Sequence, residues 1–161
     1  MGSRRRAREF ALQMLYQWDV TGSKSAEVLK IFWVNIGFAP DEQVYAERLF
    51  LGVAKEVRAL DLAIETYSHK WRVSRMPPVD RNVLRLGTYE LLHIEDVPVS
   101  VSINEAIELG KHYSTSESGA FINGILDKVG QGLSPALIKR KSELAQQGQE
   151  DGQFLPDDEE V

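Results

Sequence analysis

Apolar residues recur with helical spacing along almost the whole chain, and this periodicity limits the fold more than any other sequence feature. In the first such segment, of about residues 4–19, Phe10, Met14 and Trp18 fall on one side of a helix. Similar stripes follow through most of the remaining sequence. The one strand-like run, residues 97–101, is short and contains a proline, so it cannot support a sheet. We therefore expect an all-α bundle of about seven helices with short connections.

Helix boundaries are predicted by prolines and by capping patterns. Met76-Pro77-Pro78 is the strongest breaker, because neither proline donates a backbone hydrogen bond, and a new helix should begin there. The pairs Ser102/Glu105 and Ser114/Glu117 both have the spacing of a capping box, which predicts that a helix begins at each serine. We expect a helical domain of residues 1–133, with halves of about 1–72 and 73–133.

Charge is distributed unevenly along the sequence. The net charge is −5, but the last twelve residues hold six acidic residues and no basic one, so the other 149 residues together carry +1. Because residues 134–161 are polar to acidic, they are predicted to be a disordered C-terminal tail. The folded part is therefore close to neutral, although four arginines gather at its start.

The composition argues against most enzyme classes. The chain has no cysteine, which excludes disulfides, a thiolate nucleophile and thiolate metal sites. Glu90 and His93 have the Glu-x-x-His spacing of di-metal helical bundles, but no second such motif exists. We expect no catalytic residues, no metal and no cofactor. With no apolar run long enough to span a bilayer and no signal-peptide core, a cytoplasmic protein without a membrane partner is expected.

The arginine cluster Arg4, Arg5, Arg6 and Arg8 is the strongest functional signal. Like charges at a helix N-terminus repel one another and oppose the helix dipole, so a polyanion that neutralises them would explain their placement. The guanidinium fork binds phosphates with two hydrogen bonds and stacks on exposed bases, as recognition of single-stranded RNA requires. A solvated charge run is the alternative reading of the same residues.

Three blocks of sequence resemble, in the same order, motifs of the NusB family of bacterial transcription antitermination factors. They are residues 4–18, residues 79–92, and residues 102–111 continuing into 121–128. The resemblance extends over about residues 4–130. It implies a NusB-like bundle of two three-helix-type halves without catalytic activity.

Members of this family bind the boxA segment of nascent RNA and pair with NusE, a small-subunit ribosomal protein. Together they help to assemble the antitermination complex on RNA polymerase, also in ribosomal RNA transcription. The RNA-binding residues that the resemblance implies are Arg4, Arg5, Arg6, Arg8, Glu117, Ser118 and Phe121. The NusE-binding residues that it implies are Tyr16, Asp80, Arg81, Arg85 and Glu90.

Several alternatives remain open at this point. Phe121 lies in an apolar stripe and fits a core position as well as a base-stacking one, and Asp80 fits a helix start as well as a partner contact. The chain could also be a domain related to the N-terminal domain of an RNA cytosine methyltransferase. A self-associating helical adaptor is a third reading, and a homodimer that covers the arginines is compatible with the sequence.

Overall fold

The computed structural model describes the backbone of residues 2–153 and the side chains of residues 3–148, and the regular structure within that range is entirely helical. This confirms the predicted all-α fold. Two short 3-10 turns, Trp33–Asn35 and Val73–Arg75, interrupt the connections. The seven α-helices are α1 (Gly2–Thr21), α2 (Ser25–Phe32), α3 (Pro40–Ser68), α4 (Pro78–His93), α5 (Val99–Tyr113), α6 (Ser118–Gln131) and α7 (Pro135–Gln153).

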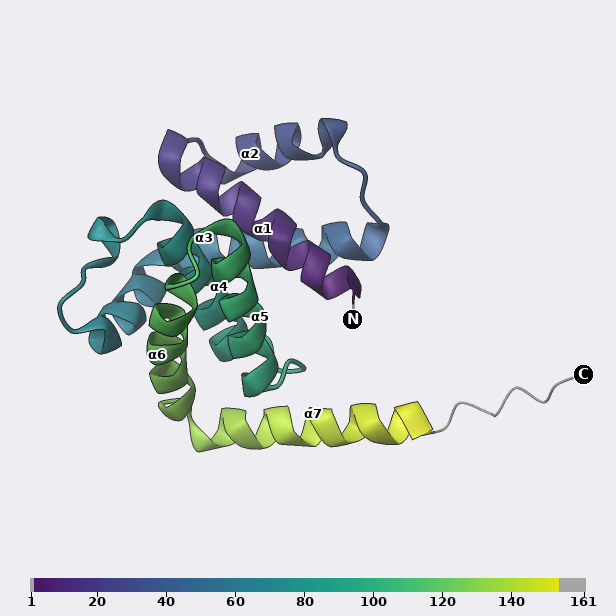
Figure 1. The fold of residues 1–161 in the computed structure, drawn as a ribbon. Helices are drawn as coiled ribbons and strands as arrows, with labels where there is room; N and C mark the ends of the chain where they lie inside the picture. The colour runs from purple at the N-terminus through teal and green to yellow at the C-terminus, as the bar shows by residue number, and fades with distance from the viewer. Residues whose placement is uncertain (1, 154–161) are drawn as a thin grey trace, which may run out of the picture.

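Helix α4 occupies the middle of the bundle. It contacts α1, α3, α5 and α6, and these helices surround it (Figure 1). Ten of its sixteen residues are buried, as expected for a helix that is apolar around much of its circumference. Helix α4 begins at Pro78, whose ring fixes the backbone in a conformation suited to the first helical turn. A proline lacks the backbone N–H, but at this position that N–H would have no partner within the helix. The predicted break at the double proline is therefore confirmed.

The two predicted capping boxes are wrong. Helix α5 begins at Val99, directly after Pro98, so Ser102 lies inside the helix. Its hydroxyl donates to the buried carboxylate of Glu90 (2.8 Å) instead of capping a helix end. The N-cap residue of α6 is Glu117, which makes no side-chain capping bond. For Ser102 the helix start at Pro98 and the buried carboxylate of Glu90 determine its role, while Ser114 accepts a hydrogen bond from Ser118.

Part of the predicted disordered tail is a helix in the structure. Residues 135–153 form α7, which extends away from the bundle after α6 (Figure 1). Lys141 of α7 is buried, and its Nζ donates to the carbonyl oxygens of Ile94 and Val97 (both 2.7 Å), just beyond the end of α4. The low apolar content of this segment hid the helix, because a lysine rather than an apolar stripe attaches it to the bundle. Residues 154–161 lie outside the described range, and the division into halves at residue 72 stays a prediction.

Among the helices that the structure describes, none combines the length and the apolar character needed to cross a membrane.

Two glycines provide a test of the packing between helices. A Cβ at Gly52 would overlap the ring of Tyr89 on α4, so Gly52→Ala should lower the free energy of unfolding by about 1–3 kcal/mol. At Gly124, exposed on α6, a Cβ meets nothing within 4 Å, so Gly124→Ala should raise that free energy by about 1 kcal/mol through helix propensity. Urea unfolding followed by circular dichroism measures both. Equal effects of the two substitutions would contradict the close approach of α3 and α4.

Candidate RNA-binding and partner interface

The first arginines of α1 lie at the surface and reach neighbouring elements. Arg4 donates to Asp96 in the α4–α5 connection (2.8 Å). Arg5 donates through Nε and Nη2 to the two carboxylate oxygens of Glu105 on α5 (3.1 and 2.9 Å). The side chains of these arginines are nevertheless 38% and 63% exposed. They are therefore accessible to a ligand, although each already has a partner within the protein.

Arg6 connects α1 to the start of α3. Its guanidinium lies 5.3 Å from the ring centre of Phe10 and donates to the carbonyl oxygen of Gly37 (2.9 Å). The carboxylate of Glu42 lies 3.7 Å from its Nε and also accepts from the backbone N–H of Ala39 (2.7 Å), which caps α3. Arg6 is 54% exposed and, like Arg4 and Arg5, is paired with a carboxylate of the same protein.

Arg8, one of the predicted RNA-binding residues, lies in the interior of the bundle. Its side chain is 6% exposed, and its Nε and Nη2 donate to the carboxylate of Glu90 (2.6 and 3.1 Å). The same carboxylate accepts from the hydroxyls of Tyr45 (2.9 Å) and Ser102 (2.8 Å). Side chains from α1, α3, α4 and α5 thus meet at one buried carboxylate.

Contact with Glu90 keeps Arg8 charged and the Tyr45 hydroxyl protonated in this buried network. Burial opposes the charge of Arg8, but its hydrogen bonds and attraction to Glu90 outweigh burial, so the pKa of Arg8 is raised. Burial and the negative charge of Glu90 both raise the pKa of the Tyr45 hydroxyl, which therefore remains a donor. Breaking such a buried pair by removing one partner typically costs about 3–5 kcal/mol.

The start of α6 holds the second predicted RNA-binding group. Glu117 is exposed, and Phe121 is half-buried against the hydrophobic core. Ser118 is buried, and its hydroxyl donates to that of Ser114 (3.0 Å), so it shapes the α5–α6 turn rather than the surface. Of this group, Glu117 and part of the Phe121 ring are therefore accessible to a ligand.

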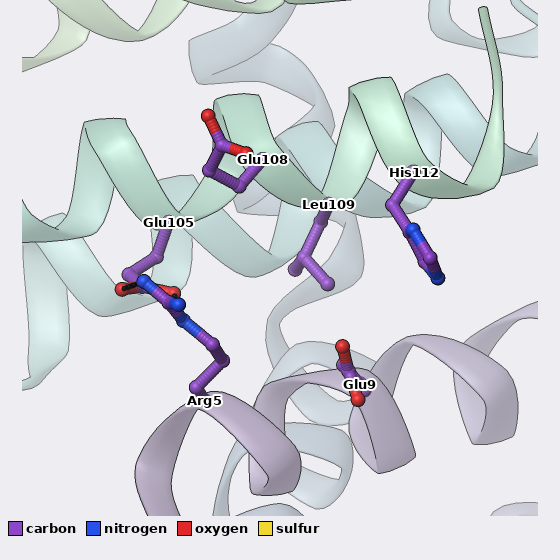
Figure 2. A pocket seen from close by; sticks show the side chains of 6 residues that line it. All are labelled: Arg5, Glu9, Glu105, Glu108, Leu109 and His112. Carbon is purple, nitrogen blue, oxygen red and sulfur yellow. Dashed lines mark hydrogen bonds and ion pairs between the residues drawn. The ribbon is translucent and has the colours of Figure 1, made fainter. Parts of the chain in front are cut away.

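A hollow of about 160 Å³ lies between α1 and α5. Figure 2 shows Arg5 and Glu105 facing each other at one end, with Glu9 directed from α1 toward α5. The hydrogen bond from Arg5, and the charges of Arg8 and Arg5, hold the pKa of Glu105 below its usual value against the effect of burial. In the described part of the chain, no group of three or more acidic or histidine side chains is arranged to hold a metal ion. The residues that line the hollow are Arg5, Glu9, Glu105, Glu108, Leu109 and His112.

A second, mainly apolar hollow of about 260 Å³ surrounds Tyr16, the first of the predicted partner-binding residues. The Tyr16 side chain is 45% exposed, so its ring is available to a binding partner. The other lining residues are Leu12, Gln13, Val79 and Tyr113, from α1, α4 and the end of α5.

Two of the predicted partner-binding residues, Arg85 and Glu90, are buried. Arg85 is 7% exposed and donates two hydrogen bonds to Asp61 on α3 (2.8 and 2.9 Å) and one to Asp19 on α1 (3.2 Å). Glu90 is 2% exposed and is the acceptor for Arg8. Both residues connect helices inside the bundle, because their carboxylate or guanidinium groups find partners there.

Asp80 and Arg81 lie in the first turn of α4, next to the hollow around Tyr16. Asp80 is 7% exposed, and its buried Oδ1 has no hydrogen-bond partner. Arg81 donates to the carboxylate of Asp19 and to the carbonyl oxygen of Met76. The described contacts explain the position of Arg81 but leave one oxygen of Asp80 without an assigned role.

Sequence reasoning missed several residues that position these sites, among them Tyr45, Asp96 and Asp19. Tyr45 lies in the apolar stripe of α3, where a buried hydroxyl requires a polar partner, and that requirement was the one available signal. Asp96 lies in a connection with no motif around it, and Asp19 lies near the end of α1. The partner of Asp96 is 92 residues away in the sequence and that of Asp19 is 62 residues away, so no local pattern could have revealed these two residues.

Comparison with known proteins gives one consistent result. Residues 5–131 match the sequence profile of the NusB family. The transcription antitermination protein NusB of Anaeromyxobacter dehalogenans is 56% identical over 140 residues, which cover 84% of this chain and 96% of that protein. NusB of Sorangium cellulosum is 45% identical over 133 residues, covering 83% and 95%.

Solved structures agree with the sequence matches. The structure of T. maritima NusB superposes with a TM-score of 0.78 at 37% identity, covering 88% of this chain and 97% of that one. A crystal structure of the antitermination factors NusB and NusE in complex with double-stranded RNA matches with a TM-score of 0.75 at 29% identity, covering 83% and 99%.

Asp19 provides a pH test of the contacts between α1 and α4. Burial opposes its ionisation, but hydrogen bonds from Arg81 and Asn82 and the charge of Arg85 lower its pKa. The pKa of Asp19 in the folded state lies below the unfolded value of about 3.9. The ionised carboxylate therefore stabilises the folded protein above about pH 4, and this contribution is lost as the pH falls through the folded-state pKa. The stability advantage over Asp19→Asn should therefore be constant above about pH 5 and should shrink below about pH 4. Urea unfolding at several pH values measures it, and a pH-independent difference would contradict this role.

Proposed function

This chain belongs to the NusB family of transcription antitermination proteins, and we propose that it performs that function by binding boxA-type single-stranded RNA together with NusE, the small-subunit ribosomal protein. The complex would then help to assemble the antitermination machinery on RNA polymerase, also in ribosomal RNA transcription. The solved NusB–NusE complex with the same fold supports both partners. The RNA in that complex is double-stranded, so binding to the single-stranded form stays our own prediction.

The observation that carries this proposal is the group of exposed guanidinium groups at the start of α1. Arg4, Arg5 and Arg6 are between 38% and 63% exposed and project from the first turns of one helix. Such a group can neutralise several consecutive phosphates of a strand. Arg8, which is buried, would act by fixing the position of α1 rather than by touching RNA.

The hollow around Tyr16 is the surface that we propose for NusE. It is mainly apolar and contains a half-exposed aromatic side chain, which are the features of the centre of a protein interface. Arg81, next to Val79 at its edge, would contribute a polar contact, whereas Asp80 is as buried as Arg85 and would act by placing the start of α4. The buried Arg85 and Glu90 would have no direct part in this interface.

The relatives are regulators of transcription, and on this basis we also propose that the chain has no catalytic activity and acts in the cytoplasm, where nascent RNA is accessible to it. The matched antitermination proteins align over nearly their whole length. This favours an antitermination factor over a domain related to an RNA methyltransferase.

Replacing Arg4, Arg5 and Arg6 together by Ala tests the RNA site. Each lost phosphate contact should lower the slope of log affinity against log salt by about 0.7, so the slope should fall by about 2. Affinity for boxA RNA at low salt should decrease at least about tenfold. Fluorescence anisotropy at several salt concentrations measures both quantities. A matched triple variant of the exposed Lys24, Lys30 and Lys70 serves as the control, and an unchanged slope in the arginine variant would contradict the RNA site.

Replacing Tyr16 by Ala tests the partner surface. Loss of a central aromatic contact should weaken NusE binding by more than about tenfold, while binding of boxA RNA to the free protein should not change. Isothermal titration calorimetry with NusE measures the first quantity. The control is Tyr67→Ala, because Tyr67 is half-buried but does not line this hollow, and NusE affinity equal to that of the unmodified protein would refute the assignment.

A further inference from the structure

Each exposed arginine at the start of α1 faces a carboxylate of the same protein, and each carboxylate comes from a different element. The arginines are the ones that we propose to bind RNA. The pairs are Arg4 with Asp96, Arg5 with Glu105, and Arg6 with Glu42.

We propose that Asp96 and Glu105 form a carboxylate latch on the RNA site: they hold Arg4 and Arg5 in the free protein, and RNA phosphates must displace them. RNA binding would then be an exchange of one anion for another on the same guanidinium groups. This inference rests on the proposed binding of RNA by α1.

The hydrogen-bond geometry shows why a carboxylate and a phosphate would compete. Glu105 accepts from both Nε and Nη2 of Arg5, which is the edge that a guanidinium offers to a phosphate with two parallel bonds. Asp96 accepts from Nη2 of Arg4 at 2.8 Å. A phosphate cannot take the same edge of Arg5 until Glu105 leaves it.

Exposure separates the pairs that can exchange from the pair that cannot. In the Arg8–Glu90 pair the two side chains are 6% and 2% exposed, and two further hydroxyls bind the carboxylate. In the Arg4–Asp96 pair they are 38% and 51% exposed, and in the Arg5–Glu105 pair the arginine is 63% and the carboxylate 17% exposed. Exposed ion pairs are weak, so each latch contact should lower RNA affinity by only about two- to fivefold. The latch would therefore adjust the affinity without blocking the site.

The surroundings of Glu105 strengthen this effect. Glu9 and Glu108 line the same hollow beside Arg5, so a phosphate that replaces Glu105 would approach three carboxylates (Figure 2). Neutralising a latch carboxylate should raise the affinity for RNA, because its arginine is then free to bind a phosphate.

A double-mutant cycle tests the latch, with full-length protein and boxA single-stranded RNA as the probe. Asp96→Asn and Glu105→Gln should each raise the affinity about two- to fivefold. The increase should disappear when Asp96→Asn is combined with Arg4→Ala, and likewise when Glu105→Gln is combined with Arg5→Ala. Glu27→Gln, which removes the same charge from an exposed position on α2, is the control and should change the affinity by less than about 1.5-fold.

Other results would overturn the proposal in distinguishable ways. An increase that persists without the arginine would indicate general charge repulsion and not a latch. A decrease in affinity in Glu105→Gln or Asp96→Asn would show that the carboxylate positions its arginine for RNA. If Arg4→Ala and Arg5→Ala leave the affinity unchanged, the proposed RNA site itself fails. Because Asp96 lies in an exposed connection, its variant keeps the test decisive even if Glu105→Gln alters the fold.

Discussion

The buried pair of Arg8 and Glu90 is the interaction on which the rest of the structure depends. An ionised carboxylate in the interior is stable only when several donors satisfy it, and here Arg8, Tyr45 and Ser102 supply them from three other helices. Because Glu90 needs all three donors, α1 must hold one rotation about its axis and one position along that axis relative to α3, α4 and α5. The exposed arginines before Arg8 are displayed at one place on the surface for this reason.

The same principle explains how three polar side chains of α4, those of Arg81, Asn82 and Arg85, are accommodated between the helices. Asp19 near the end of α1 accepts hydrogen bonds from Arg81, Asn82 and Arg85, and Asp61 on α3 accepts from Arg85. Helix α1 is thus joined to α4 by a charge pair near each end. Apolar packing between them supplies most of the stability, while the charge pairs select a single register.

The sequence predicted those features that depend on local spacing. The helical stripes, the break before Pro78 and the central position of α4 follow from neighbours three or four residues apart. The interior roles of Arg8, Arg85 and Glu90 could not be predicted, because the charged groups with which they form hydrogen bonds lie 24 to 82 residues away. Glu105 has the spacing of a capping residue, but the preceding Pro98 had already started the helix, and the carboxylate was left to pair with Arg5. Charged residues were assigned to the surface by their type, and only tertiary contacts could show otherwise.

Lys141 gives the last helix a structural importance that its composition conceals. The match to the family ends at residue 131, ten positions before this lysine. Its ammonium group supplies donors to the carbonyl oxygens of Ile94 and Val97, which follow the helix that carries Glu90. A protein shortened to the family boundaries would keep every predicted binding residue but would leave these carbonyls without that donor. The shortest fragment that folds like the whole chain should therefore extend at least through Lys141 in the first half of α7.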